Sequence, residues 1–257
     1  AYQALKSLKA HKTDRNDAQG LAHLARTGFF KPVHVKSLPA HAVRSLIAAR
    51  KKLVGQRVTL ENQIRGLAVV FGVRLPRGLS PAFVEQVLGM SDGVDGLSGA
   101  MRGLIAARAA VLAAVAAIDA DIKRMTRASD ACRALMTIPG VGPLTALAFA
   151  AAIDNPNRFK RSRDVGAYIG LVPRRHQSGE IDYVGRITKC GDRRLRTLLY
   201  EAANVMMTRY KGPLKLKDWA FVIAKRSTMR QARVALARRL AVIMHAMLRS
   251  GSVFKPA

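Results

Sequence analysis

A single serine lies between two clusters of basic residues in the segment RRHQSGEIDYVGRITKCGDRRLR, residues 174–196. A serine hydroxyl is a strong nucleophile only when it loses its proton, and guanidinium and ammonium groups stabilise both that oxyanion and the charge developing on an attacked phosphate. Ser178 is therefore a candidate nucleophile, with Gly179 leaving room for a substrate and His176 a conceivable base. The letters QSGE fit equally well a β-turn between two short strands, and a solvated loop histidine is the commoner role for His176. Chemistry alone leaves the two interpretations even, with a small preference for the turn.

Two acids near the start of the chain could hold a metal. Asp14 and Asp17 are three residues apart, so on a helix they project from one face and could share a hard divalent cation such as Mg²⁺. Two carboxylates are an incomplete site, and acids are also common in the first turn of a helix, where they cap it and offset its dipole. On spacing alone, this second explanation is the better one.

The segment IPGVGPLTA, residues 138–146, could bind a phosphate. Gly140 and Gly142 flank a valine between two expected helices, so the backbone can approach a phosphate, and the N–H groups at the start of the second helix can bind it. The segment resembles the hairpin of helix-hairpin-helix DNA-binding modules. A tight turn made of small residues is the alternative, but the charge of the chain favours phosphate contact.

The composition indicates a polyanionic partner. The chain has 257 residues, with 44 Lys+Arg against 16 Asp+Glu, and its formal net charge of +28 far exceeds what solubility requires. Its 49% hydrophobic content is ample for a folded core. The longest uninterrupted apolar runs are too short to span a bilayer, so no membrane is expected. Cys132 and Cys190 have no partner at metal-binding spacing, which favours a reducing cytoplasm with neither zinc nor disulfide.

Periodicity predicts helices almost throughout. A helix is expected over residues 12–27, starting near Thr13 or Asp14 and ended by Gly28. Two longer helices with seven-residue repeats are expected to pair antiparallel, joined by a Gly/Pro-rich elbow at residues 72–100 that holds a short helix around 82–88. The repeats are Leu46, Leu53, Leu60 and Leu67 in the first helix, and Leu104, Val111, Ile118 and Met125, broken by Arg108, in the second.

Further helices follow a domain boundary expected after Arg127. A capped helix, a turn at residues 138–142 and a helix opened by Pro143 come first. Two more helices are expected over residues 192–210 and 228–249. The stretch EIDYVGRI is the one that has the alternation of a strand.

Three segments taken in order resemble a known family: HKTDRNDAQGLAHLARTG, then TIPGVGPLTALAFAAAI, then FKRSRDVGAYIGLVPRRHQSGEIDYVGRITKCGDRRLRTLL. They are similar to the bacterial insertion-sequence transposases of the DEDD-plus-serine type, the bridge-RNA-guided recombinases. The resemblance covers nearly the whole chain and is most specific over residues 158–199. It implies an α/β RuvC-like (RNase H-like) domain whose four acids bind divalent metal, a coiled-coil connection, and a C-terminal domain that supplies a serine nucleophile.

The resemblance also implies roles for particular residues. Asp14 and Asp17 match the last two acids and would hold Mg²⁺, while Ser178 matches the serine that attacks a DNA phosphate and forms a covalent phosphoserine. No nucleotide cofactor is expected, because the ester keeps the energy of the broken linkage. The implied partners are donor and target DNA, a guide RNA and further copies of the chain, as a dimer or a dimer of dimers. The expected location is the bacterial cytoplasm, at the nucleoid.

The other two acids of the family lie upstream of KTDRND, in a part that this chain lacks. We therefore expect either a fragment of a longer product or an inactive truncated copy. Residues 1–257 alone should then bind nucleic acid in a salt-sensitive way and recombine little.

Four basic residues are candidate nucleic-acid contacts on charge and proximity to Ser178 alone. Arg186 and Lys189 are assigned to phosphate or transition-state contacts, and Arg174 and Arg175 to nucleic-acid binding. All four are equally compatible with plain backbone or RNA binding.

The expected fold is mainly α in three parts. Residues 1–36 form the C-terminal remnant of the RuvC-like domain, residues 37–127 an antiparallel coiled-coil hairpin, and residues 128–257 a transposase domain with a helix-hairpin-helix and a short β-hairpin. One alternative is a non-enzymatic protein that binds structured RNA or branched DNA. A second is a hydrolytic nuclease run by the two acids alone, which would leave free DNA ends and no protein–DNA adduct.

Overall fold

The computed structural model describes residues 11, 13–30, 32–75 and 81–256. The chain divides into two compact units, residues 1–36 and 37–257. Helices dominate both, and one two-stranded antiparallel sheet is found among the described residues, so the predicted mainly α fold is confirmed. The division into three functional parts stays a prediction.

The first unit contains helix α2, Asp14–Thr27, close to where periodicity predicts it. The hydroxyl of Thr13 accepts a hydrogen bond from the backbone N–H of Asn16 at 3.2 Å and so caps the first turn. Gly28 ends the helix in the left-handed conformation, with φ of 64°. Both ends of the helix therefore follow from local sequence.

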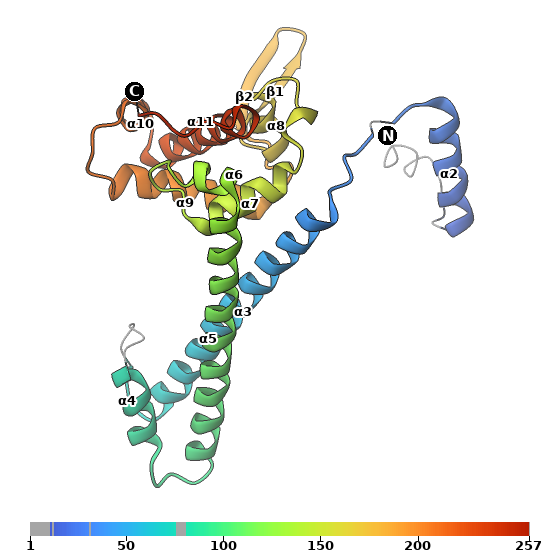
Figure 1. Cartoon of the computed structure of the whole chain (residues 1–257). Helices are drawn as coiled ribbons and strands as arrows, with labels where there is room; N and C mark the ends of the chain where they lie inside the picture. Colours follow the sequence, from blue (N-terminus) through green and yellow to red (C-terminus); the bar gives the residue numbers. More distant parts are fainter. Residues whose placement is uncertain (1–10, 12, 31, 76–80, 257) are drawn as a thin grey trace. The chain divides into compact units, whose positions relative to one another are not determined.

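The second unit begins with a long helical hairpin. Helices α3 (Leu38–Val70) and α5 (Leu97–Ala128) run antiparallel, and α4 (Pro81–Ser91) packs against α5 near the far end (Figure 1). The predicted short helix is thus α4, and α5 begins inside the predicted elbow. Residues 76–80 of that elbow lie outside the described residues.

The buried face of α3 differs from the predicted one, whereas the predicted positions of α5, from Leu104 to Met125, are buried or half-buried. The leucines at seven-residue spacing from Leu46 to Leu67 are half-buried, whereas Ile47 and Ile64 are almost fully buried. The buried face also contains a charged residue, Glu61, whose exposed fraction is 4%. Buried positions of α3 lie one residue after leucines of the repeat, as Ile47 does after Leu46 and Glu61 after Leu60. The leucine repeat missed them because some of these inward positions hold polar side chains.

Ion pairs between the two helices explain why polar residues are tolerated there. Arg50 donates two hydrogen bonds to Asp119, at 2.5 and 3.0 Å. Further along, the buried Arg108 donates to Glu61 at 3.1 Å, and Arg57 lies 3.7 Å from the same carboxylate. Arg108, which interrupts the sequence repeat, is therefore neutralised across the seam and does not break it.

Six helices and a short 3₁₀ turn form the main core beyond the hairpin. They are α6 (Asp130–Leu135), α7 (Pro143–Ile153), η1 (Pro156–Arg158), α8 (Asp164–Ile169), α9 (Arg193–Thr208), α10 (Lys215–Arg226) and α11 (Met229–Ser250). Helix α11 packs against α8, α9 and α10 and buries Leu236, Leu240 and Met244 completely. Thr228 caps it by accepting from the N–H of Gln231, as predicted.

The hairpin and the core share one hydrophobic cluster. Val43 and Ile47 of α3 and Ile122 of α5 are buried in the same cluster as the residues of α7. The start of α3 is also tied to the end of α7, because Ser37 donates to Asp154 through its backbone N–H at 2.9 Å and its hydroxyl at 2.6 Å. The base of the hairpin is therefore anchored in the core.

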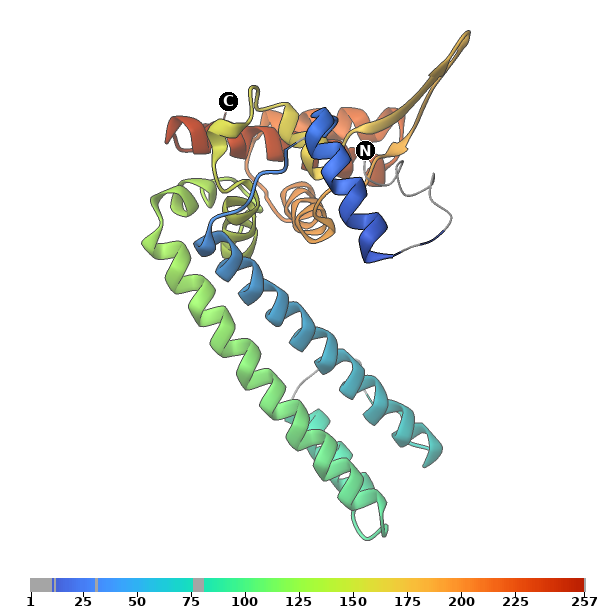
Figure 2. The same ribbon diagram turned by 90° about the vertical axis from the view of Figure 1, so that its right-hand side faces the viewer.

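Strands β1 (Pro173–Ser178) and β2 (Ile181–Ile187) form a hairpin that projects from the helices (Figure 2). The sequence predicted a short β-hairpin here, in which EIDYVGRI alternates like a strand and PRRHQS has no apolar alternation. Pairing with β2 makes β1 a strand, and all six of its residues are exposed.

Helix α5 contradicts the expectation that no segment is long and apolar enough to span a bilayer. It has 32 residues, and an 18-residue window within it reaches a mean hydropathy of 1.8, so by length and composition it could cross a membrane. Counting uninterrupted apolar runs missed this, because glycine and isolated polar residues lower a window's average only slightly. One such helix among the described residues is weak support for a membrane, since helices of soluble proteins pass the same test.

Candidate functional site

The predicted nucleophile lies at the tip of the β-hairpin. Ser178 is the last residue of β1 and pairs with Ile181, so Gly179 and Glu180 form a two-residue turn. Gly179 has φ of 56°, which a glycine adopts without strain. Ser178 is exposed, and within the described chain its hydroxyl has no hydrogen-bond partner. The turn interpretation is thus correct as geometry, and the same geometry presents the hydroxyl to whatever approaches the tip.

His176 shares a face of the hairpin with Ser178, because the two residues are two positions apart on one strand. Its ring stacks on the ring of Tyr183, with centroids 4.8 Å apart and planes inclined by 15°. No hydrogen bond joins His176 to Ser178 in the part of the chain that the structure describes. The exposed Tyr183 and His176 instead form a flat aromatic surface beside the serine.

The opposite face of the hairpin carries an ion pair. Arg175 donates to both carboxylate oxygens of Asp182, at 2.9 and 2.6 Å. This guanidinium holds the pKa of the Asp182 carboxyl below its usual value. Arg175, predicted to contact nucleic acid, therefore has its charge balanced within the hairpin, and Asp182 would compete with a phosphate for it.

The other three predicted basic contacts lie toward the base of the hairpin. Arg174 donates to the carbonyl of Thr188 at 3.2 Å. Arg186 and Lys189 are exposed. All three stand away from the tip along the strands, so the structure brings none of them into hydrogen-bonding contact with Ser178 among the described residues.

Two loops meet closely at the base of the hairpin. Gly170 and Gly191 both adopt left-handed conformations, with φ of 78° and 73°. A side-chain carbon on Gly170 would collide with the backbone of Cys190, and one on Gly191 with the carbonyl of Tyr168. Both positions therefore need glycine for two independent reasons, conformation and space.

Arg196 of α9 fastens this base. Its Nη1 lies 2.9 Å from the carbonyl of Ile169, 2.6 Å from that of Cys190 and 3.2 Å from that of Gly191. One guanidinium thus joins the loop before β1 to the loop after β2. Sequence reasoning missed this role and treated the arginines of GDRRLR alike. The signal was available in the spacing, since Arg196 follows the helix cap Asp192 by one helical turn.

The loop between α6 and α7 has a packing role that sequence reasoning did not foresee. Gly140 has φ of 88°, and a side-chain carbon there would collide with the Ala202 carbonyl of α9. Gly142 caps α7 and has open space around it. The two helices and the turn between them are present as predicted, but Gly140 faces another helix, and the helix-hairpin-helix function stays a prediction. Gly142 and the start of α7 remain the candidate phosphate contact.

Asp14 and Asp17 both lie in the first turn of α2. Asp14 is exposed, Asp17 is half-buried, and the backbone N–H of Asp17 donates to the Thr13 carbonyl at 2.9 Å. No cluster of three or more His, Cys, Asp or Glu that could hold a metal occurs among the described residues. Carboxylates three residues apart on a helix suit a hard cation in chemistry and spacing, and the role of Asp14 and Asp17 as metal ligands stays a prediction.

Comparison with known proteins assigns the chain to a family. A profile described as "Transposase IS116/IS110/IS902 family" matches residues 132–219, and a second profile, described as "Transposase" and of the DEDD IS110 type, matches residues 1–70. The match to residues 1–70 contains α2 and α3, the match to residues 132–219 begins after α5, and together they include Ser178, Asp14 and Asp17.

Curated relatives agree with these matches over most of the chain. The transposase for insertion sequence element IS1111A of Coxiella burnetii is 33% identical over 246 residues, which is 94% of this chain and 68% of the relative. A probable family 20 transposase of Pseudomonas aeruginosa is 29% identical, over 97% of this chain and 75% of its own length. A pilin gene-inverting protein of Moraxella bovis is 32% identical over 47% of this chain and 37% of its own. The chain therefore belongs to the IS116/IS110/IS902 family of transposases.

Proposed function

We propose that this transposase cuts and rejoins DNA through a covalent phosphoserine at Ser178. The observation that carries the proposal is the position of Ser178: an exposed hydroxyl with no protein partner within the described chain, at the tip of a hairpin whose base is fixed by Arg196. The β1–β2 hairpin, residues 173–187, is called the arm below. Because its base is fixed, it can place one small nucleophile against a DNA duplex while the core stays at a distance. The relative named for inverting a pilin gene supports a reaction that breaks and rejoins DNA, since inversion requires both.

The proposed step is a transesterification. The Ser178 oxygen forms a bond to phosphorus while a bond from phosphorus to a deoxyribose oxygen breaks, and the proton of the serine passes through a base to the leaving hydroxyl. The phosphoserine ester keeps the energy of the original linkage, so attack by a new DNA hydroxyl reseals the strand without a nucleotide cofactor. The basic residues near the hairpin base, Arg186 and Lys189, would hold the flanking phosphates.

Asp14 and Asp17 would hold a divalent cation, with Mg²⁺ expected from an all-carboxylate ligand set. When bound, that ion supplies charge stabilisation at the phosphate. A guide RNA that specifies donor and target DNA, and assembly as a dimer or dimer of dimers, are also proposed, on the resemblance of the family segments alone. An RNA guide would relieve the protein of base reading, which suits a surface rich in Arg and Lys.

The test is the capture of a protein–DNA adduct. The protein, with any upstream residues that its gene encodes, is incubated with Mg²⁺, copurified RNA and labelled DNA, and then run on a denaturing gel. We expect a shifted band that Ser178→Ala abolishes and that the matched surface change Ser252→Ala leaves intact. An adduct that survives Ser178→Ala would refute the assignment. Full activity of Ser178→Ala in every assay would favour the non-enzymatic nucleic-acid-binding alternative.

A further inference from the structure

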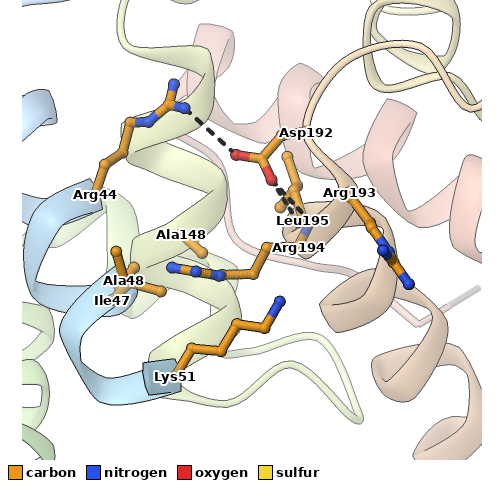
Figure 3. Close-up of a pocket in the computed structure, with 9 residues that line it drawn as sticks. All are labelled: Arg44, Ile47, Ala48, Lys51, Ala148, Asp192, Arg193, Arg194 and Leu195. Atoms are coloured by element: carbon orange, nitrogen blue, oxygen red, sulfur yellow. Dashed lines mark hydrogen bonds and ion pairs between the residues drawn. The ribbon is translucent and has the colours of Figure 1, made fainter. Parts of the chain in front are cut away.

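A basic pocket lies where the start of α3, the middle of α7 and the first turn of α9 meet (Figure 3). Its volume is about 400 Å³, within the range of about 300–1,000 Å³ that is usual for small-ligand sites. Four cations and one carboxylate line it, together with a few apolar side chains. The charged residues are Arg44, Lys51, Arg193, Arg194 and Asp192.

The α3 side of the pocket follows from helical spacing. Arg44 and Lys51 are two turns apart, and Ile47 and Ala48 lie between them on the same face. Figure 3 shows the Arg194 side chain reaching from α9 toward α3 between Arg44 and Lys51, while Arg193 points away from them. Three cationic side chains from two helices therefore gather over an apolar floor.

The charges of this pocket are poorly balanced within the protein. Asp192 uses one carboxylate oxygen to accept the N–H groups of Arg194 and Leu195, at 2.8 and 3.2 Å, and thereby caps α9. Its other oxygen lies 3.7 Å from Arg44. The Nε of Arg194 is buried and has no hydrogen-bond partner among the described residues. A buried donor without a partner is costly, and like charges held together repel, so these side chains favour an anionic ligand.

We infer that this pocket binds a backbone phosphate of the nucleic acid, with Arg194, Arg44 and Lys51 as its ligands. A phosphodiester supplies the missing negative charge and acceptor oxygens, and the apolar floor accommodates the attached sugar. The pocket also lies next to the arm, because Asp192 directly follows Gly191 at the hairpin base. A strand gripped here is therefore held at the foot of the hairpin that carries Ser178. The inference rests on the proposed nucleic-acid function and adds an anchoring site to it.

The first test measures nucleic-acid binding against salt concentration. Fluorescence anisotropy with a labelled DNA duplex, and with the same sequence as RNA, is compared for wild type, Arg194→Gln, Lys51→Met and the control Arg209→Gln, which removes a charge at the other end of α9. The association constant K falls as salt rises, and the plot of log K against log salt has a negative slope. We expect each pocket variant to make that slope less steep, by about 0.9 for duplex DNA and about 0.7 for a single strand, while the control leaves it unchanged. Circular dichroism checks that each variant is folded.

The outcomes separate the inference from the function on which it rests. A less steep salt dependence in the pocket variants supports phosphate binding in the pocket. Whether it is seen with DNA, with RNA or with both identifies the nucleic acid that the pocket holds. Pocket variants that bind as the control does would overturn the inference while leaving the proposed function intact. Failure of the wild type to bind either nucleic acid would instead overturn the proposed function. Inorganic phosphate could raise the melting temperature of the wild type and not that of the pocket variants, while all of them bind nucleic acid equally. The pocket would then be a small-anion site, and the inference would be overturned.

A second measurement needs no variant. Acetylation of lysines in the wild-type protein is followed by mass spectrometry, with and without nucleic acid. We expect Lys51 to be protected severalfold by the nucleic acid and Lys225, exposed at the end of α10, to be unchanged. Equal acetylation of Lys51 in both conditions would contradict occupancy of the pocket.

Discussion

The two hairpins of this protein are built on opposite principles. The α3–α5 hairpin has its own interior, with a buried Glu61–Arg108 pair and a fully buried Phe83 under two guanidinium groups. The β1–β2 hairpin has no buried residue along either strand. The first is held along its length by contacts between its helices, and the second mainly by its base. A segment with no interior of its own is free to present every side chain to a partner, which suits the contact with DNA that we propose for it.

The largest expected effect is on the α3–α5 hairpin. Arg108→Met leaves the buried Glu61 carboxylate without its closest cation, because Arg57 is 3.7 Å away and more exposed. We expect a loss of about 3–5 kcal/mol in the free energy of unfolding, measured by urea denaturation. Adding Glu61→Leu to that variant should restore most of it, since the charge is then removed with its partner. A single variant as stable as wild type would show that the interior of the hairpin does not hold it together.

The base and the tip of the β-hairpin should respond differently to the same change. Gly191→Ala combines a left-handed conformation with a collision against the Tyr168 carbonyl, so strain of about 1–3 kcal/mol is joined by overpacking of similar size. Gly179→Ala has the conformational cost alone, about 1–2 kcal/mol, because no atom of the described residues lies within 4 Å of the added carbon. Thermal unfolding of the two variants measures the difference. Equal losses would mean that the base is not the part that fixes the arm.

A smaller pH effect is expected from the core to which both hairpins are attached. His245 is fully buried between the Ser162 hydroxyl and the Pro156 carbonyl, and burial, reinforced by Arg249 and Arg158, lowers its pKa. The unfolded chain then binds a proton more readily than the folded one. Stability from this group is complete above the ordinary histidine pKa near 6.5 and falls as pH drops through the lowered value.

Melting temperatures against pH test this effect. Between pH 7 and pH 5, His245→Gln should show a shallower decline than wild type, and His176→Gln, on the exposed arm, should follow the wild-type curve. If instead His176→Gln flattened the curve, the arm and not the core would be the acid-sensitive part.

The smallest effect is expected from a valine on the arm. Val184→Thr changes a side chain that is 69% exposed and should alter the free energy of unfolding by less than about 0.5 kcal/mol. The matched change Val165→Thr, at a fully buried position of α8, should cost about 1–3 kcal/mol. Urea denaturation of both variants decides the comparison. A large loss at Val184 would reveal packing of the arm that the described structure lacks.

Local signals in the sequence were enough to predict most helices. Thr13 and Gly28 mark α2, and Thr228 marks α11, because caps are satisfied within a few residues of the chain. The burial of Arg108 within the predicted seam of α5 could not be foreseen, because its charge is paired with Glu61, 47 residues away in the sequence. The first strand of the predicted β-hairpin has no strand pattern in its own residues, because its strand character comes from pairing with β2.

The sequence was enough to name the residues of the candidate site, but not to predict which contacts each of them makes. Ser178 stands out through its basic neighbours and the family resemblance, and its role stays a prediction. The tasks of the neighbouring arginines could not be separated by composition. Arg196 binds backbone carbonyls, Arg175 pairs with Asp182, and Arg194 extends into a pocket with an unpartnered nitrogen. Identical side chains acquired different tasks through the backbone that surrounds them.

The closely packed glycines at the base of the β-hairpin make the length of the hairpin independent of the helical core. Because Gly170, Gly191 and Arg196 bring the two ends of the segment together independently of its strands, its length can change without disturbing the helices beneath. Adding or removing one residue pair on each strand would move Ser178 outward or inward by roughly 7 Å, the repeat of two strand residues. In the proposed mechanism, the distance between the core and the phosphate that Ser178 attacks would thus change in steps, by insertion and deletion alone.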